Sequence, residues 1–151
     1  MKKSKCKKNI ESEIRNQELG IRDGDSLKKI NKESWDRYKN SFSKIKIDSM
    51  LDEINSRIKF LNLDISALKP WELIKNRDER AGVIIYNTLE HLRHIAWMLW
   101  PFMPETAEKI WENLGLDVKE EIKKDFKEAI EWGGLPEDVK VKKGEILFPR
   151  L

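Results

Sequence analysis

The helical spacing of apolar residues from residue 28 to residue 130 is the feature that most constrains how this chain can fold. Aromatic and aliphatic side chains recur every three or four residues, which places them along one face of a helix. Prolines and glycines interrupt the pattern where helices are expected to begin or end. The sequence therefore predicts an all-α fold, an antiparallel helical bundle with a short non-helical C-terminal segment.

The first two expected helices have clear apolar faces. Residues 28–44 are predicted to form a helix with an aromatic face. Asp48 is expected to cap the second helix, because its carboxylate can accept a backbone N–H that has no partner within the helix. The residues expected on the buried faces of these two helices are Trp35, Tyr38, Phe42, Leu51, Ile54, Ile58 and Leu61.

Prolines set the boundaries in the middle of the chain. Pro70 suits the first turn of a short helix over 70–75, where its missing N–H costs no hydrogen bond. Asp78 is expected to cap the long helix that follows, and Pro101 to end it. Pro104 then opens a helix that Gly115 ends. The residues expected on the apolar faces of these two helices are Ile84, Ile85, Leu89, Leu92, Ile95, Ala96, Leu99, Trp100, Ala107, Ile110, Trp111 and Leu114.

The C-terminal part changes its pattern. Asp117 is expected to cap a last helix, and the pair Gly133-Gly134 breaks the helical spacing. Beyond it, residues 139–148 read as a hairpin or an extended segment that lies on the core. The face expected on the last helix comprises Ile122, Phe126, Ala129 and Ile130. The domain prediction is a basic, poorly ordered arm over 1–30, a helical domain over 31–131 and an extended segment over 132–151.

Composition narrows the class of function. A chain of 151 residues suits one domain, and it contains no glycine-rich motif for cradling phosphate, so we expect it to act by binding. No apolar run approaches the roughly 20 residues of a membrane helix. The single cysteine, Cys6, excludes an internal disulfide and has no histidine near it in sequence to serve as a base. We expect a soluble, cytoplasmic protein in a reduced compartment, with no membrane partner.

Two histidines could in principle hold a metal ion. His91 and His94 are three residues apart, but the nearest acidic residue, Glu90, is expected to point elsewhere on the helix. Both histidines are therefore interpreted as helix-surface or helix-edge residues, with no metal site. The acidic residues of the C-terminal helices alternate with lysines and are interpreted as solvated faces. These are Glu105, Glu108, Glu112, Glu120, Glu121, Asp125 and Glu128.

Positive charge is concentrated at the N-terminus. The formal net charge is +3, and the excess comes from Lys2, Lys3, Lys5, Lys7 and Lys8. Such an arm attracts polyanions in a salt-dependent way, so nonspecific nucleic-acid binding is one hypothesis. A solvated terminus that carries no specificity is the alternative.

Trp71 stands directly after Pro70, at the start of the expected short helix. An exposed indole in this position can stack on an unpaired base. Positive side chains close in sequence could hold the phosphate backbone: Lys69, Lys75, Arg77 and Arg80. The alternative is a core tryptophan that locks one helix against another.

Four segments recur in the order and spacing of a known family. They are Asn-Leu-Asp-Ile-Ser-Ala-Leu-Lys-Pro-Trp-Glu-Leu over 62–73, Pro-Phe-Met-Pro-Glu-Thr-Ala-Glu-Lys-Ile-Trp-Glu-Asn-Leu-Gly over 101–115, Trp-Gly-Gly-Leu over 132–135 and Gly-Glu-Ile-Leu-Phe-Pro-Arg-Leu over 144–151. Together they resemble the anticodon-binding domain of methionyl-tRNA synthetases, over roughly residues 32–151.

The resemblance implies a role for the motif at 62–73. In the family the tryptophan stacks on the cytosine of the CAU anticodon, helped by the proline before it, which corresponds here to Trp71 and Pro70. Asn62 opens the same motif. Asp64 stands where the family usually has tyrosine, and the Asn-Leu-x-Asn-Arg motif of the family's first helix is not found. The HIGH and KMSKS motifs of the catalytic domain have no counterpart, so the ATP and Mg of the parent enzyme imply no cofactor in this chain.

The leading hypothesis is a tRNA anticodon-binding domain of methionyl-tRNA synthetase type, with Trp71, Pro70, Asn62, Lys69, Lys75 and Arg77 as the binding residues. It would read the anticodon loop of methionine tRNA and would not be catalytic alone. The alternative is a helical protein-interaction module that docks on a separately encoded catalytic chain. Its candidate contacts are Ile146, Leu147, Phe148 and Leu151.

Overall fold

The structure, a computed structural model, describes residues 22–144 and Leu147. Helices account for most of these residues, and no strand occurs among them. The helices are α2 (Gly24–Ser43), α3 (Ile47–Leu68), α4 (Pro70–Lys75), α5 (Arg80–Leu99), α6 (Pro104–Asn113), α7 (Val118–Lys123) and α8 (Phe126–Ala129). The prediction of an all-α helical bundle is confirmed.

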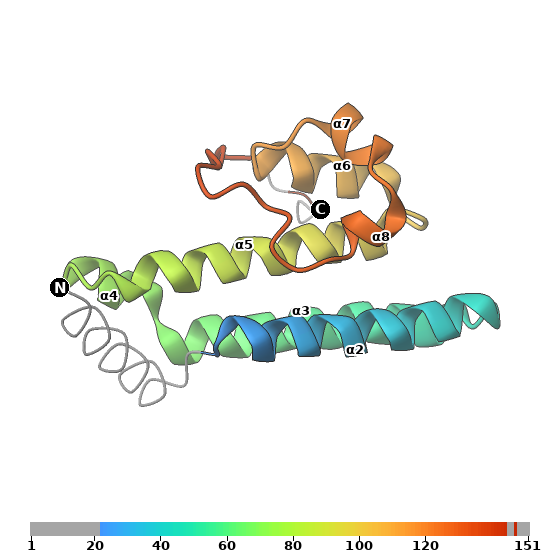
Figure 1. The fold of residues 1–151 in the computed structure, drawn as a ribbon, viewed down its shortest axis with the longest axis horizontal. Helices are drawn as coiled ribbons and strands as arrows, with labels where there is room; N and C mark the ends of the chain where they lie inside the picture. Colours follow the sequence, from blue (N-terminus) through green and yellow to red (C-terminus); the bar gives the residue numbers. More distant parts are fainter. Residues whose placement is uncertain (1–21, 145–146, 148–151) are drawn as a thin grey trace, which may run out of the picture.

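Three long helices make the body of the bundle (Figure 1). Helices α2 and α3 run side by side in opposite directions, and α5 packs along α3, again antiparallel. The short helix α4 joins α3 to α5 at one end. Helices α6, α7 and α8 cover the opposite side of the C-terminal half of α5, so this half lies in the middle of the protein. None of the helices in the described region is long and apolar enough to cross a membrane.

Helix α2 begins at Gly24, four residues before the predicted start. The reason is Asp23, whose carboxylate accepts the backbone N–H of Ser26 at 2.6 Å and so satisfies one free donor of the first turn. The predicted cap of the next helix is wrong: α3 begins at Ile47, its N-cap is Lys46, and Asp48 lies within the first turn. A carboxylate in the first turn still favours the helix through its dipole.

The prolines further along the chain and the N-cap of α7 were predicted correctly. Pro70 and Pro104 both lie in the first turn of their helices. Helix α5 ends at Leu99, two residues before Pro101. Asp117 caps α7 by accepting the backbone N–H groups of Lys119 and Glu120.

Gly115 ends the segment of α6 with a left-handed backbone, φ 79°. A Cβ atom there would lie 2.4 Å from the backbone oxygen of Lys140. Gly115→Ala is therefore expected to lower the free energy of unfolding by about 2 kcal/mol, since strain and a backbone clash act together. Thermal melting followed by circular dichroism measures the loss. Gly24→Ala is the matched control, because a Cβ at Gly24 meets no atom within 4 Å; equal melting of the two variants would contradict the expectation.

Tryptophans form the centre of the apolar core. Trp97 and Trp111 pack with ring centroids 4.9 Å apart, and Trp100 lies 6.0 Å from Trp97. Trp35 is buried on α2 beside Tyr38, which donates its hydroxyl to the carbonyl of Met98 at 2.8 Å. Burial raises the pKa of Tyr38 to about 12. The prediction that Trp35, Trp100 and Trp111 lie on apolar faces is confirmed, and Trp97 joins them in the core.

The predicted apolar faces were partly misplaced. On α3, Ile54 and Leu61 are buried as expected, whereas Leu51 and Ile58 are exposed. Met50 and Arg57 take their places, because the face that meets α2 and α5 is rotated relative to the stripe of largest aliphatic side chains. Ile85 on α5 and Phe42 on α2 are likewise exposed.

The region after α6 differs from the prediction of one helix. Lys124 has an extended backbone, ψ 142°, which splits the segment into α7 and α8. Ala129 is buried, but Ile122 and Phe126 are exposed. Residues 139–144 form neither helix nor strand; Lys142 donates its backbone N–H to the carbonyl of Asn113 at 2.8 Å, which holds this part of the chain against α6.

A buried polar cluster lies between α5 and the C-terminal part, and the sequence interpretation missed it. Glu90 and Arg93 are fully buried and ion-paired at 2.7 Å, and Glu121 lies 3.4 Å from Arg93. Trp97 donates its indole N–H to Glu121 at 2.9 Å. The interpretation of Glu121 as part of a solvated face is therefore wrong: its lone pairs are satisfied inside the protein.

The two histidines belong to the same buried region, so their interpretation as surface residues is wrong. His91 is 3% exposed and His94 is 0% exposed. Glu90 does reach a histidine: its carboxylate oxygen lies 3.2 Å from Nε2 of His94. Trp35 donates its indole N–H to Nδ1 of the same ring at 3.1 Å. Glu90 and His94 are four residues apart, which places them on one face of a helix.

Candidate nucleic-acid interface

The sharp corner between α3 and α4 is set by Lys69 and Pro70. Lys69 has a left-handed backbone, φ 43° and ψ 61°, and its N–H donates to the carbonyl of Ile65 at 2.9 Å. Proline disfavours a right-handed helical conformation in the residue before it, so α3 cannot run through this point. Pro70 then opens α4, and its ring fixes the backbone from which Trp71 projects.

Trp71 is the exposed tryptophan of the chain. Its side chain is 48% exposed, whereas Trp35, Trp97 and Trp111 are at most 8% exposed. Trp100 and Trp132 are half-buried. The ring of Trp100 packs against Trp97 and Trp111, and the ring of Trp132 packs against His91 and His94. The interpretation of Trp71 as a core residue that locks two helices is thus wrong, and its indole is free to meet a ligand.

The other residues of the predicted site lie on the same end of the bundle. Asn62 and Lys69 are seven residues apart on and just after α3, which places them near one face. Lys75 lies one turn after Trp71 on α4, and Arg77 follows that helix with φ 54°. Asn62, Lys69, Lys75 and Arg77 are all exposed. Pro70 is half-buried, as expected of a residue at the corner.

Two charges of this region are held by neighbours. Lys69 is paired with Glu72 at 3.4 Å, with both side chains about half exposed, so the pair is weak and easily exchanged for a phosphate. Arg80 is bound through its side chain and its backbone N–H to the carboxylate of Asp78. Arg80 therefore helps to fix the start of α5. The prediction that Asp78 caps this helix is wrong: the N-cap is Glu79, and Asp78 lies one residue earlier and accepts the backbone N–H of Arg80.

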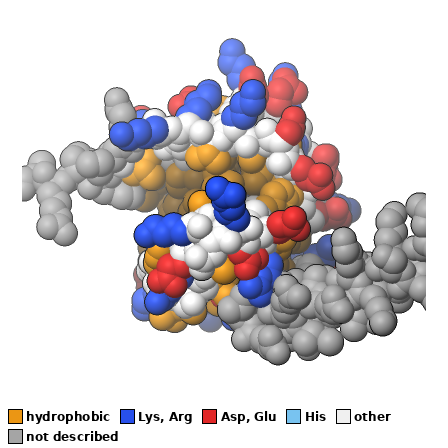
Figure 2. All heavy atoms as spheres, turned by 90° about the vertical axis from the view of Figure 1, so that its left-hand side faces the viewer, with side chains coloured by type: hydrophobic (Ala, Val, Ile, Leu, Met, Phe, Trp, Pro, Cys, Tyr) orange, Lys and Arg blue, Asp and Glu red, His pale blue; other side chains and the backbone are white. Residues whose placement is uncertain are grey.

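Figure 2 shows this end of the molecule: the part nearest the viewer carries lysines, arginines and acidic residues with hydrophobic side chains among them, and a hydrophobic hollow separates it from the upper part of the molecule. On α4 and the start of α5 the exposed large hydrophobic residues are Trp71, Ile74 and Val83. Trp71 and Ile74 are three residues apart and so share a face of α4. An apolar platform with cations at its edge is the arrangement that binds unpaired bases.

The described residues add no candidate metal site to this interface. Within the described residues, no group of three or more histidine, cysteine or acidic side chains could hold a metal ion. Cys6 and the lysines of the predicted arm lie outside the described residues.

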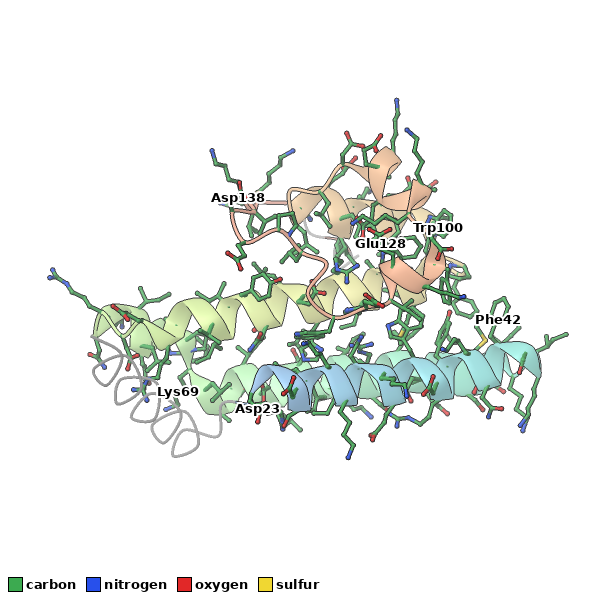
Figure 3. All side chains as sticks on the ribbon, in the orientation of Figure 1. Asp23, Phe42, Lys69, Trp100, Glu128 and Asp138 are labelled. Carbon is green, nitrogen blue, oxygen red and sulfur yellow. The ribbon has the colours of Figure 1, made fainter. Side chains whose placement is uncertain are left out.

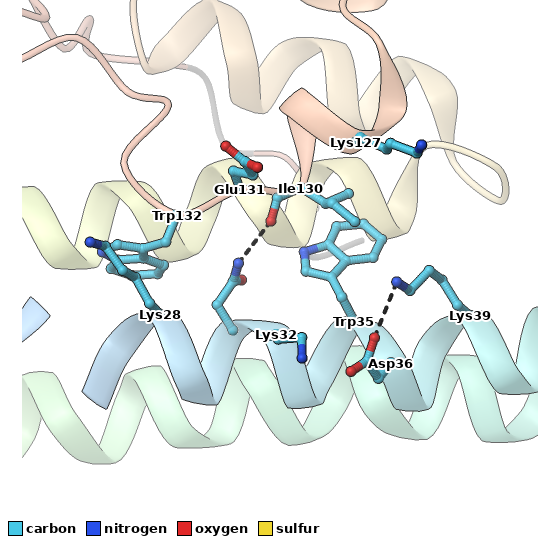
Figure 4. Close-up of a pocket in the computed structure, with 10 residues that line it drawn as sticks. Lys28, Lys32, Trp35, Asp36, Lys39, Lys127, Ile130, Glu131 and Trp132 are labelled. Carbon is cyan, nitrogen blue, oxygen red and sulfur yellow. Dashed lines mark hydrogen bonds and ion pairs between the residues drawn. The ribbon is translucent and has the colours of Figure 1, made fainter. Parts of the chain in front are cut away.

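A second cluster of positive side chains was missed by the sequence interpretation, which assigned the basic excess to the N-terminus. Lys28, Lys32 and Lys39 lie along one side of α2, and Lys127 of α8 lies opposite them (Figure 4). The spacing of four and seven residues between the lysines of α2 was the available signal, since it places them near one helix face.

Comparisons with known proteins agree with the resemblance seen in the sequence. Residues 25–151 match the family described as the anticodon binding domain of methionyl tRNA ligase. A methionine–tRNA ligase of Clostridium acetobutylicum is 40% identical over 111 residues, which cover 72% of this chain and 16% of the relative. The enzyme of Clostridium tetani is 33% identical over 84% of this chain and 19% of the relative.

A third relative is also similar to the chain. The methionine–tRNA ligase of Streptomyces coelicolor is 36% identical over 62% of this chain and 19% of the relative. The chain thus spans less than a quarter of the length of the curated relatives that it matches. No solved structure matches it.

Proposed function

Because the chain belongs to the family of anticodon-binding domains of methionyl-tRNA ligases, we propose that it binds the CAU anticodon loop of methionine tRNA through Trp71. The observation that carries the proposal is the exposure of this indole beside the Pro70 corner, while the other five tryptophans are less exposed and pack against other rings of the protein. A rigid ring on a fixed backbone loses little conformational freedom when a base stacks on it.

The cations around Trp71 hold the RNA rather than read it. Lys69, Lys75 and Arg77 are exposed, and such side chains contact phosphates without regard to sequence. Asn62 is the polar side chain of the motif that can hydrogen-bond a base edge. In this proposal the chain performs no chemistry itself and uses no cofactor. Aminoacylation, with its ATP and Mg, belongs to a catalytic domain joined to it or docked on it, in the cytoplasm where translation occurs.

Trp71→Ala is expected to weaken binding of methionine tRNA about 10- to 100-fold, because one stacked base contributes roughly 1–3 kcal/mol. Trp71→Phe should recover part of the affinity, since a phenyl ring also stacks. Filter binding or fluorescence anisotropy with the full chain measures both, using methionine tRNA and the same tRNA with an altered anticodon. The expected result for the native chain is a clear preference for CAU that Trp71→Ala removes.

Phe42→Ala is the matched control. Phe42 is an aromatic residue with 58% exposure at the opposite end of the bundle from Lys69 (Figure 3). Its loss should leave tRNA affinity unchanged. Equal affinity for every anticodon, unaffected by Trp71→Ala, would overturn the proposal.

The alternative of a protein-interaction module depends on the C-terminal apolar residues. Ile146, Phe148 and Leu151 lie outside the described residues, and Leu147 is half-buried. No contact of the described residues favours this alternative over RNA binding. It would gain support if the chain bound a catalytic ligase subunit and no tRNA.

A further inference from the structure

A groove of about 610 Å³ lies between α2 and the segment from α8 to Trp132. We call it the lysine groove and define it by Lys28, Lys32, Lys39 and Lys127, with Trp35 and Trp132 in its wall (Figure 4). From this groove we infer that the protein has a second RNA-contacting surface, which holds the phosphate backbone of the tRNA beside the anticodon loop. The inference rests on the proposed function for the identity of the RNA.

The groove carries an excess of positive charge, and two of its lysines have no ion-pair partner among the described residues. Four lysines face two carboxylates, those of Asp36 and Glu131. Lys39 pairs with Asp36 at 3.1 Å and Lys28 pairs with Asp25 at 3.8 Å, both on the exposed surface, where such interactions have little strength. Lys32 and Lys127 form no ion pair with any residue from 22 to 144. Charges left free on both sides of a groove favour an anion between them.

The shape of the groove suits an extended polyanion. Lys28 and Lys39 are eleven residues apart on α2, which corresponds to about 17 Å along the helix axis. A strand in a nucleic-acid duplex carries one phosphate per roughly 3.4 Å of axis, so the lysines of α2 can follow several consecutive phosphates. Lysine acts as a mobile point charge rather than as a fixed fork, and this suits backbone contacts that carry no sequence information.

The groove floor is held in place by the core. Trp132 stacks on the ring of His94, with centroids 5.7 Å apart and an angle of 7° between the planes. Asn31, which is 2% exposed, donates to the carbonyl of Ile130 at 2.9 Å and accepts from Arg57 at 2.7 Å. These contacts fix α2 against the segment that carries Lys127, so the lysines on the two sides are presented at a constant separation.

The groove begins at the end of the bundle that carries Trp71. Arg22, just before α2, pairs with Asp64 near the end of α3, and it also lies over the ring of Phe60 at 4.4 Å. The start of α2 is thereby fastened to the part of α3 that leads into the Trp71 corner (Figure 1). An RNA whose loop meets Trp71 would have its stem within reach of Lys28 and the lysines beyond it.

The test is the double variant K32E/K127E in the full chain, with binding to methionine tRNA measured at several KCl concentrations. We expect at least a tenfold loss of affinity near 0.1 M salt. The slope of log affinity against log salt should fall by about 1.4 to 1.8, since each lost phosphate contact contributes about 0.7 to 0.9. The preference for the CAU anticodon should remain, because the groove contacts the backbone alone.

The matched control is K109E/K119E, which changes the net charge equally at two exposed lysines of α6 and α7 that form no ion pair with any described residue. If both double variants weaken binding equally, or if neither does, the inference is overturned. Loss of anticodon preference in K32E/K127E would also overturn it. If K32E/K127E alone weakens binding while Trp71→Ala has no effect, the groove stands and the proposed function fails.

Discussion

Replacing Glu90 with alanine is expected to lower the free energy of unfolding by about 4 kcal/mol. Glu90 is completely buried on α5. Its carboxylate lies 2.7 Å from the guanidinium of Arg93 and neutralises that buried positive charge. Truncating one member of a buried ion pair leaves the other charge without compensation, which costs far more than the pair contributes. Arg93 would keep only Glu121, at 3.4 Å, and two backbone carbonyls.

Glu90 also holds the C-terminal segment. It accepts the backbone N–H groups of Gly133, Gly134 and Leu135 at 2.8–3.0 Å. The carbonyl of Leu135 in turn accepts the hydroxyl of Tyr86 at 2.7 Å. The Trp-Gly-Gly-Leu motif is therefore a turn bound to one carboxylate, and Glu90→Ala should release it together with the ion pair.

Chemical denaturation followed by tryptophan fluorescence measures this loss. Glu90→Gln keeps the shape of the side chain but replaces one acceptor oxygen with an NH2 group. This group would face the guanidinium and backbone N–H donors that Glu90 now accepts, so the variant should also be destabilising. Glu120→Ala is the control, because Glu120 is 69% exposed and pairs only with the exposed Lys123. A loss of less than about 1 kcal/mol for Glu90→Ala would show that the cluster does not stabilise the fold in this way.

The parts of the fold that follow from local chemistry were predictable from sequence. Pro70 and Pro104 fix the starts of two helices, and Gly115 fixes an end, because each acts through its own backbone. The same reasoning placed Trp71 at the start of a short helix but left open whether its indole is exposed or buried in the core. These signals need no knowledge of the rest of the chain.

The polar core could not be predicted because its pairs are distant in sequence. Arg93 meets Glu121 across 28 residues, and Trp35 meets His94 across 59 residues. A histidine or a glutamate between charged neighbours is usually solvated, so the local pattern indicated a surface. The rotation of the buried face of α3 also depends on residues distant in sequence. Arg57 lies on this face because it donates a hydrogen bond to Asn31 on α2, 26 residues earlier.

The buried histidines make the protein sensitive to mild acid. Burial lowers the pKa of His94 to about 4. The ring also has both nitrogens occupied when neutral: Trp35 donates to Nδ1, and Nε2–H can donate to Glu90. A second proton on Nδ1 would face the indole N–H, so the charged form has no place for its hydrogen. Burial, together with the nearby charge of Arg57, lowers the pKa of His91 to about 3.

Both shifts act in the same direction on stability. Unfolded histidines bind protons near pH 6.5, whereas these two stay neutral in the folded state until about pH 4 and pH 3. Protons therefore bind the unfolded chain preferentially between these limits, and stability falls as the pH falls. Each group contributes up to about 1.4 kcal/mol per pH unit. Glu90 adds to the loss at lower pH. Burial alone would raise the pKa of its carboxyl, but hydrogen bonds from His94 and Arg93 hold this pKa below its ordinary value, so protons bind the carboxyl preferentially in the unfolded chain.

We expect the free energy of unfolding to drop by about 3 kcal/mol between pH 7 and pH 5, well above the range in which carboxylates alone titrate. Urea denaturation at a series of pH values measures this dependence. His91→Phe should remove about half of it, because the phenyl ring can keep the edge contacts with Phe60 and Trp132 without binding a proton. The same variant should leave the salt dependence of tRNA binding unchanged. A free energy of unfolding that stays constant from pH 7 to pH 5 would contradict this expectation. It would mean that both histidines bind protons as easily in the folded protein as in the unfolded chain, although they are only 3% and 0% exposed.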